Sequence, residues 1–366
     1  MKLPSTPKIV CLYDPRFGSG YPYAFACVPD TLDRLGMKVL HVDVTSATPE
    51  SFRREVEGFG PDLIFGYLQN IHDQKRGVEL LKACHPVPAI NWSLEDPNGI
   101  IARGQSFTML DAAKHFDMWF CNDARMVDLW GVPAAFMPPG FDERVFFDAG
   151  AERIYDISYV GNLGPPVTAR MYWPYMVEMA KYGSRALMCL DRPMGIPLLP
   201  DALERLLRSK RNRRFLQGLP LWKCPWKNPA DETEKAAWIN QSKIHVGMSR
   251  VRGDWEGGLL KRLPDYPVDE TGMFYQLKGR LFHAVGTGTL ALNEHTPELE
   301  TMFDVGREIV TFAYGDVDGF ADKLAWYLKH DAEREKIARA GHERGLRDHT
   351  WSARIRQIME RVEQTL

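Results

Sequence analysis

The sequence predicts an α/β protein with two domains, each built on a parallel sheet. Short apolar runs alternate with helical segments along most of the 366 residues, and this alternation is typical of parallel strands joined by crossover helices. A chain of this length can bury two cores. Two prolines and a glycine at residues 138–140 cannot continue a strand or a helix, so the domain boundary is expected there.

Composition excludes several classes of protein. Hydrophobic residues make up 45% and charged residues 26%, with a formal net charge of -2, so any contact with a polyanion has to be local. No apolar run approaches the roughly 18–20 residues that span a bilayer, and no signal peptide precedes the first strand. The six cysteines include no Cys-x-x-Cys pair, which favours reduced thiols over metal or disulfide sites. These features predict a cytoplasmic protein without a transmembrane segment.

The first domain is expected to contain about six parallel strands. Ligands of such sheets bind beyond the carboxyl ends of the strands. Polar residues follow those ends at Asp14, His72 and Asn122. The expected strands cover residues 8–14, 37–42, 61–66, 87–92, 116–121 and 132–137.

Two further features of this domain have competing interpretations. Glu95 and Asp96 follow a strand and precede Pro97; they are candidate catalytic carboxylates, or an N-cap and first-turn acid of a helix. Gly18 and Gly20 form only half of a dinucleotide-binding fingerprint. They predict either a loop that lets a ligand approach the backbone, or a simple tight turn.

The second domain begins with a strand that runs into Gly161 and Asn162, and a loop that ends at Arg170 leads into the next helix. A glycine, a helix N-terminus and an arginine together suit a pyrophosphate. Farther on, arginines and lysines at 205–214 precede two tryptophans at 222 and 226. This region could hold a phosphorylated or nucleic acid acceptor, or it could be a solvated amphipathic helix with a capping loop.

The stretch 275–300 is the most informative. A helix over 276–285 would place Gln276, Arg280 and His283 on one polar stripe of an otherwise apolar helix. Burying Arg280 is costly unless an anion meets it. The alternative is a half-exposed helix whose polar side faces water. After the glycines at 286 and 288, a strand over 289–292 is expected, and then a helix with Thr296 as N-cap and Pro297 as its first residue.

The run from Gly272 to about Thr350 resembles the C-terminal half of the CgeB-like glycosyltransferases, a family named for a spore-maturation protein, and the resemblance extends more weakly to most of the chain. The matching motifs are Lys278–Ala284, Gly286–Gly288, Thr296–Leu299 and Gly306–Val310. The resemblance implies a GT-B fold, in which two Rossmann-like domains with parallel sheets face a central cleft. The expected domains are 1–147 on the acceptor side, 148–349 for the nucleotide-sugar, and a C-terminal helix at 350–366 that packs back on the first domain.

The resemblance also implies a function: transfer of a sugar, of the hexosyltransferase type, from a nucleotide diphosphate sugar, with UDP as the expected nucleotide. Met248 and Ser249 would lie near the base, and the helix that follows would start near Gly272 and aim its N–H groups at the diphosphate. The implied diphosphate and nucleotide ligands are Gly161, Asn162, Arg170, Gly272, Tyr275, Lys278, Arg280, His283, Thr296 and Glu298. His283 stands where the family has a glutamate that binds ribose hydroxyls, and neutral histidine can accept only one such bond. Glu294 and Glu298 are the nearest acids that could compensate.

The expected chemistry needs no metal ion and no cofactor beyond the nucleotide-sugar. The sequence offers Arg170, Lys278 and Arg280 to neutralise the departing diphosphate. An inverting reaction would also need a base, with Asp96, Glu95, His72 and Asp14 as candidates in that order. The acceptor could be a protein, a glycan, a lipid, a small molecule or a nucleic acid. The alternatives are a non-catalytic nucleotide-sugar-binding or assembly protein, and a nucleotide-sugar epimerase.

Overall fold

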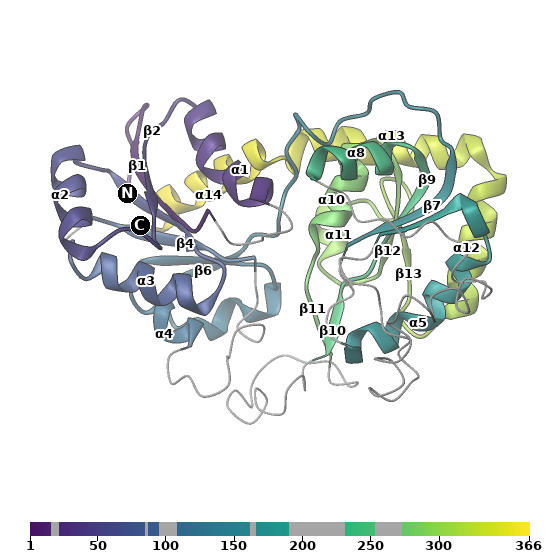
Figure 1. Ribbon diagram of the computed structural model, residues 1–366, viewed down its shortest axis with the longest axis horizontal. Helices are drawn as coiled ribbons and strands as arrows, with labels where there is room; N and C mark the ends of the chain where they lie inside the picture. Colours follow the sequence, from purple (N-terminus) through teal and green to yellow (C-terminus); the bar gives the residue numbers. More distant parts are fainter. Residues whose placement is uncertain (16–21, 85–86, 95–107, 162–165, 190–230, 253–272) are drawn as a thin grey trace, which may run out of the picture. The chain divides into compact units, whose positions relative to one another are not determined.

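The computed structural model describes residues 1–15, 22–84, 87–94, 108–161, 166–189, 231–252 and 273–366. The chain forms two compact units, each with its own sheet and core (Figure 1). Unit 1 takes in Met1–Asp142 and Thr350–Leu366, and unit 2 takes in Glu143–Trp255 and Gly272–His349.

Unit 1 is built on a six-stranded parallel sheet in the order β2-β1-β3-β4-β5-β6. Its strands are β1 (Lys8–Tyr13), β2 (Lys38–Asp43), β3 (Leu63–Tyr67), β4 (Ala89–Trp92), β5 (Met118–Cys121) and β6 (Ala134–Phe136). Its helices are α1 (Pro22–Arg34), α2 (Pro49–Phe59), α3 (Ile71–Leu81), α4 (Met109–Ala113), the 3-10 helix η1 (Ala124–Leu129) and α14 (Trp351–Thr365).

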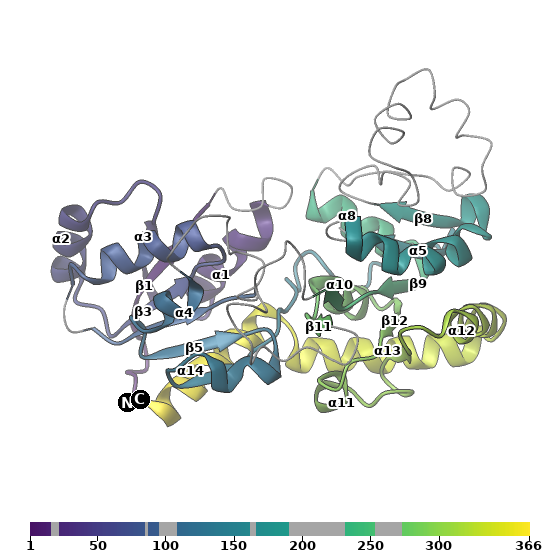
Figure 2. The same ribbon diagram turned by 90° about the horizontal axis from the view of Figure 1, so that it is seen from below.

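The core of unit 1 joins the two ends of the chain. Helix α14 packs along α1 (Figure 2). Ile355 and Ile358 of α14 are fully buried in one cluster with Cys11 of β1 and Phe65 of β3. Along each strand, successive side chains point to opposite faces of the sheet. The strand residues that pack against α14 therefore share one face of the sheet.

Unit 2 has a five-stranded parallel sheet in the order β13-β12-β9-β7-β8, and a separate two-stranded sheet, β10-β11. Helices α8 and α10 pack on one side of the larger sheet, and α5 packs with α12 (Figure 1). The strands are β7 (Tyr155–Val160), β8 (Ala186–Cys189), β9 (Ser242–Gly247), β10 (Arg250–Arg252), β11 (Met273–Tyr275), β12 (Leu290–Glu294) and β13 (Val310–Phe312). The helices are α5 (Pro166–Ala180), η2 (Gly183–Arg185), α8 (Glu232–Asn240), α10 (Gly279–Gly286), α11 (Leu299–Met302), α12 (Val317–Lys329) and α13 (Asp331–Asp348).

The prediction of two α/β units with parallel sheets is confirmed, but the predicted start of the helix that carries Arg280 was wrong. Helix α10 begins at Gly279, not near Gly272 or at Gln276. Residues 273–275 instead form β11, which pairs antiparallel with β10. The backbone N–H of Gln276 donates to Ser249 O at 2.8 Å, which continues this pairing beyond the strand. A sequence period cannot reveal such a hairpin, because its partner strands are separated by a long loop.

The cap of the next helix also differs from the prediction. Helix α11 begins at Leu299 with Glu298 at its N-cap. The hydroxyl of Thr296 is buried and makes no hydrogen bond, so Thr296 does not cap the helix through its side chain. Turn hydrogen bonds from the Leu299 and Glu300 N–H groups to Thr296 O and Pro297 O precede the helix proper. Among the helices in the described ranges, none is long and apolar enough to cross a membrane.

Candidate nucleotide-sugar site

The strands of unit 2 bring several predicted residues to one edge of the sheet. Gly161 follows β7, Met248 and Ser249 follow β9, and Thr296 follows β12. Because these three strands are adjacent and parallel, the residues after their carboxyl ends lie along the same edge. This is the edge at which open α/β sheets bind ligands.

Arg280 is held by β7 at this edge. Its side chain is buried, with 8% of its surface exposed. Nη1 donates to the hydroxyl of Tyr159, and Cζ lies 4.7 Å from the centre of the Tyr159 ring. The sequence indicated that burying Arg280 is costly unless an anion meets it. Tyr159, a phenol rather than an anion, is a partner that sequence reasoning missed.

Gly161 makes room for the Arg280 guanidinium. Its φ is +146°, a conformation that side chains disfavour. A Cβ atom at this position would stand 3.1 Å from Cζ and Nη2 of Arg280 and 3.3 Å from Nε. Any other residue after β7 would be strained at this φ and would crowd the guanidinium.

The start of α10 adds to the positive potential beside Arg280. Lys278 occupies the N-cap in an extended conformation and makes no side-chain capping bond; its ammonium donates to the Gln276 side chain. The first N–H groups of a helix have no partner within the helix, and the helix dipole is positive there. Together with the Arg280 guanidinium, this helix end is suited to bind an anion such as a phosphate.

Glu294, the last residue of β12, is the centre of a buried network. It is fully buried, and its Oε2 accepts hydrogen bonds from the Tyr172 hydroxyl at 2.5 Å, from Ser249 N at 2.9 Å and from Arg250 N at 3.2 Å. Burial raises the pKa of Glu294, while these donors act in the opposite direction. The hydrogen-bonding capacity of Oε2 is therefore used within the protein, whereas Oε1 is 3.5 Å from Arg250 Nη1.

Arg250 is stacked between two tyrosines on the exit from β9. Its Cζ lies 4.9 Å from the ring centres of both Tyr275 and Tyr314, and Nη2 donates to the Tyr275 hydroxyl at 3.0 Å. Nη1 is 3.5 Å from Oε1 of Glu294. The predicted ligand residue Tyr275 is therefore fixed by Arg250 beside Ser249, at the base of the β10–β11 hairpin.

His283 lies one turn along α10 from Gly279. Its ring stacks on Phe146, with 3.9 Å between ring centres and an interplanar angle of 4°. Nδ1 is buried without a hydrogen bond, whereas a Cβ on Gly279 would meet Nε2 at 3.3 Å. Burial, followed by the nearby Lys235, holds the pKa of His283 well below its usual range, so the ring is neutral.

In unit 1, two buried amides hold the residue before the candidate catalytic acids. Leu94 N donates to Gln69 Oε1 at 2.7 Å, and Asn122 Nδ2 donates to Leu94 O at 3.1 Å. Gln69 also binds Trp92 O. Both polar groups of the Leu94 backbone are thus tied to neighbouring strand ends, immediately before Glu95.

The remaining predicted residues differ in how much the structure describes. His72 is exposed in the first turn of α3, after the N-cap Asn70, and Asp14 is buried just after β1. Glu298 is buried at the N-cap of α11. Several predicted positions lie outside the described residues: Gly18, Gly20, Glu95, Asp96, Asn162, Gly272 and the side chain of Arg170.

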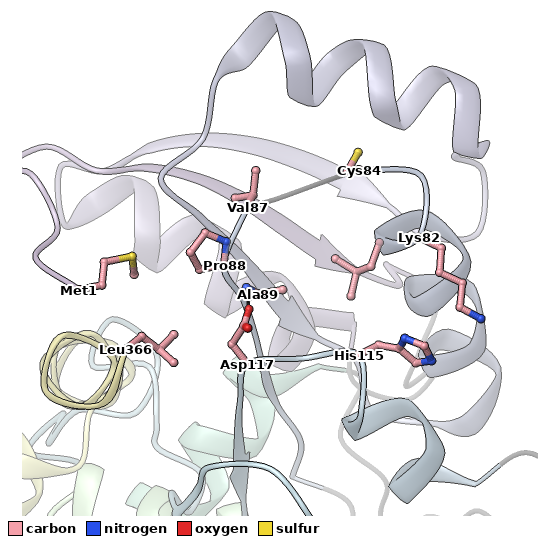
Figure 3. Close-up of a pocket in the computed structure, with 10 residues that line it drawn as sticks. Met1, Lys82, Cys84, Val87, Pro88, Ala89, His115, Asp117 and Leu366 are labelled. Atoms are coloured by element: carbon pink, nitrogen blue, oxygen red, sulfur yellow. Dashed lines mark hydrogen bonds between the residues drawn. The ribbon is translucent and has the colours of Figure 1, made fainter.

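One pocket of unit 1, about 680 Å³ in volume, lies away from the carboxyl edge of its sheet (Figure 3). Pro88 and Ala89 line it at the start of β4, together with His115 and Asp117 before β5. It is therefore at the amino ends of these strands, whereas the described residues Asp14 and Asn122 follow the carboxyl ends of β1 and β5. Within the part of the chain that the structure describes, no three His, Cys, Asp or Glu side chains are grouped as metal ligands.

Residues 200–360 match a family model described as "Glycosyl transferase-like". No curated protein matches the sequence.

Solved structures match the chain over nearly its full length. Sucrose-phosphate synthase from Thermosynechococcus elongatus has a TM-score of 0.65 at 12% identity, covering 98% of both chains. Anabaena HepE, in complex with UDP and glucose, has a TM-score of 0.62 at 12% identity, covering 98% of this chain and 100% of HepE. An α-glucosyltransferase in complex with UDP-glucose and DNA has a TM-score of 0.64 at 9% identity, covering 98% and 100%. These similarities show that the chain has the GT-B fold.

Proposed function

We propose that this GT-B protein is a glycosyltransferase that moves a sugar, of the hexosyl type, from a UDP-sugar to an acceptor hydroxyl without a metal ion. The observation that carries the proposal is the buried Arg280 guanidinium, which contacts Tyr159 and lies next to Gly161 in the first turn of α10. The names of the similar structures support the choice of nucleotide, since several contain UDP or UDP-glucose. Placement within the CgeB-like subfamily is part of the same proposal.

The chemistry requires stabilisation of a departing diphosphate. Negative charge develops on the phosphate oxygens as the bond from the anomeric carbon to oxygen breaks, and fixed cations and dipoles lower the energy of that state. Arg280 and the first N–H groups of α10 would bind these oxygens. Either Lys278 or Arg170 would supply a second positive charge, and Gly161, Asn162 and Gly272 would let the anion approach the backbone.

The nucleoside would lie along the rest of the carboxyl edge of the unit 2 sheet. Met248 and Ser249 would border the base, with Tyr275 held beside them by Arg250. Thr296 and Glu298, which follow β12, complete the proposed donor site. His283 would take part as a neutral group through the Nε2 edge that borders Gly279.

The acceptor side belongs to unit 1. Asp96 is the first candidate for the base that takes the proton of the acceptor hydroxyl, followed by Glu95, His72 and Asp14. The two hydrogen bonds that hold Leu94 would limit the movement of the chain where it enters the Glu95–Asp96 pair. Gly18 and Gly20 would lie on a loop close to the bound substrates.

The test is ligand binding followed by turnover. UDP, GDP, dTDP and their sugar conjugates are screened by thermal shift, first with EDTA and then with added divalent metal. We expect UDP and a UDP-sugar to raise the melting temperature in EDTA, because a ligand at 100 times its Kd adds about 2.7 kcal/mol to stability. Arg280→Ala should make the shift much smaller at the same UDP concentration, because the variant binds UDP more weakly. Arg307→Ala is the control, because this side chain is 83% exposed and should leave the shift unchanged.

Measuring turnover distinguishes a glycosyltransferase from a protein that only binds the nucleotide-sugar. Release of UDP from the stabilising donor, measured with mixtures of glycans, peptides, lipids and nucleic acids, should require Asp96 if the reaction is inverting. Binding of a UDP-sugar without release in any mixture would favour the non-catalytic alternative. Absence of any nucleotide shift would contradict the proposed donor site.

A further inference from the structure

We propose that Tyr159 is a positioning residue that orients the Arg280 guanidinium toward the diphosphate, an inference that rests on the proposed function. Tyr159 lies on β7 and is fully buried. A buried strand tyrosine is ordinarily a core residue, but the polar end of this one contacts the charged group of the proposed donor site.

The Tyr159 side chain makes two contacts with the Arg280 guanidinium. The Tyr159 hydroxyl accepts a hydrogen bond from Nη1, and the ring centre lies 4.7 Å from Cζ. A hydrogen bond restrains direction, and the attraction of a cation to a ring restrains distance. Acting together, they fix both the position and the rotation of the guanidinium plane.

Gly161 leaves room for this arrangement. A Cβ atom at Gly161 would stand 3.1 Å from Cζ and Nη2 and 3.3 Å from Nε of Arg280, so a side chain there would crowd the guanidinium while it is bound to Tyr159. Tyr159 and Gly161 are two residues apart on the chain, so one strand end supplies both the restraint and the room for it. A flexible arginine is thereby converted into a cation of fixed direction.

The neutral charge of the Tyr159 phenol matters as much for the donor site as its position. A phenol is neutral at the working pH of an enzyme, so its hydrogen bond orients Arg280 without cancelling the positive charge. A carboxylate in the same place would neutralise the cation before the diphosphate arrived. Preorganised charge of this kind stabilises a developing anion without further rearrangement.

The test compares ligands with and without the diphosphate. Tyr159→Phe keeps the ring and removes only the hydroxyl. We expect its affinity for UDP to fall by about tenfold or more, as for loss of a hydrogen bond to a charged group, while its affinity for uridine stays within about twofold. A general disturbance of the domain would weaken both ligands equally, and that outcome would overturn the inference.

A double-mutant cycle tests whether Tyr159 acts through Arg280. Removing the hydroxyl should have no further effect on UDP binding in an Arg280→Ala background, because contacting residues are not additive. Additive losses would contradict a positioning role. Tyr175→Phe is the matched control: this buried phenol of the same unit accepts from Gly315 N at 2.7 Å, elsewhere in the core, and its loss should leave both affinities unchanged.

The proposed function and this inference can fail separately. If the parent protein does not bind UDP, both are wrong. If the parent binds UDP, requires Arg280, and Tyr159→Phe binds it as the parent does, the donor site stands and the role of Tyr159 is wrong. In turnover, the variant should also show a lower kcat, because the restraint acts on the leaving diphosphate.

Discussion

The hydroxyl of Tyr172 on α5 donates a 2.5 Å hydrogen bond to the fully buried carboxylate of Glu294 at the end of β12. The same hydroxyl accepts from Arg250 N at 2.8 Å. One phenol thus connects a helix, the end of a strand and the start of the β10–β11 hairpin. Burial and the nearby Glu294 raise the pKa of Tyr172 well above its usual value, so the phenol stays protonated and acts as the donor.

Tyr172→Phe should destabilise unit 2. The change removes the phenol donor from a buried carboxylate and the acceptor from Arg250 N, and we expect a cost of about 1.5–3 kcal/mol. Urea unfolding followed by tryptophan fluorescence measures it. Tyr175→Phe is the comparison, because it removes a single bond to a neutral N–H and should cost about 1 kcal/mol. Equal losses would show that the carboxylate adds nothing to the Tyr172 bond.

Acid should weaken unit 2 through two buried histidines. Burial, with help from Arg280 and Lys235, lowers the pKa of His245 to about 3, and the pKa of His283 is also well below its usual range. Both rings are neutral in the folded protein but bind protons in the unfolded chain below about pH 6.5. Their contribution is therefore present above pH 6.5 and is lost as the pH falls toward 3, with a slope of about 1.4 kcal/mol per unit for each group.

His245→Gln checks this origin. The variant loses the 2.8 Å bond between His245 Nδ1 and the Ser158 hydroxyl, so it is less stable at pH 7. However, its stability should fall less steeply than that of the parent between pH 6.5 and 4.5, as measured by urea unfolding at several pH values. His72→Gln, a change at an exposed position, should leave the parent slope in place. A parent slope that persists in His245→Gln would contradict the assignment.

Gly341→Ala should destabilise the protein although alanine favours helices. A Cβ at this position in α13 would stand 2.2 Å from the backbone oxygen of Glu308. That contact requires the backbone to move, which costs about 1–3 kcal/mol, whereas the gain in helix propensity is only about 1 kcal/mol. A lower melting temperature is expected. Arg339→Ala changes an exposed residue of the same helix and should shift the melting temperature little.

Removing Trp351 should detach α14 from the core of unit 1. The ring is 5% exposed and lies 5.2 Å from the Trp92 ring centre and 6.4 Å from that of Tyr67. Trp351→Ala should cost about 3–5 kcal/mol, and hydrogen exchange should show α14 amides losing protection. Trp351→Phe keeps much of the apolar contact and should cost less. Unchanged exchange in the alanine variant would mean that α14 is held by its other contacts.

Elements that depend on local pattern were predicted well. The six strands of unit 1 are found where apolar runs end on polar residues, and their parallel pairing agrees with the helices between them. Periodicity succeeds here because each element is stabilised by one continuous apolar face.

The candidate site was predicted only in part. Arg280 and Gly161 were each singled out, from the cost of burying a charge and from a glycine after a strand, and the structure brings them together. The sequence offered one signal for Tyr159, its position two residues before that glycine. However, a tyrosine in a strand is usually a core residue. The network at Glu294 gave none, because its donors Tyr172 and Ser249 are far away along the chain.

The amino-acid sequence by itself determined the alternation of strands and helices, the parallel sheets, and the presence, on a helix predicted over 276–285, of an arginine that is costly to bury without an anion. Each of these follows from residue type and spacing within a few turns of chain. The tertiary structure alone decided that β11 replaces the first turns of that helix, that Tyr159 orients Arg280, and that Glu294 binds backbone N–H groups. These contacts join residues brought together by strand order, and no local pattern encodes which distant side chain meets a buried polar group.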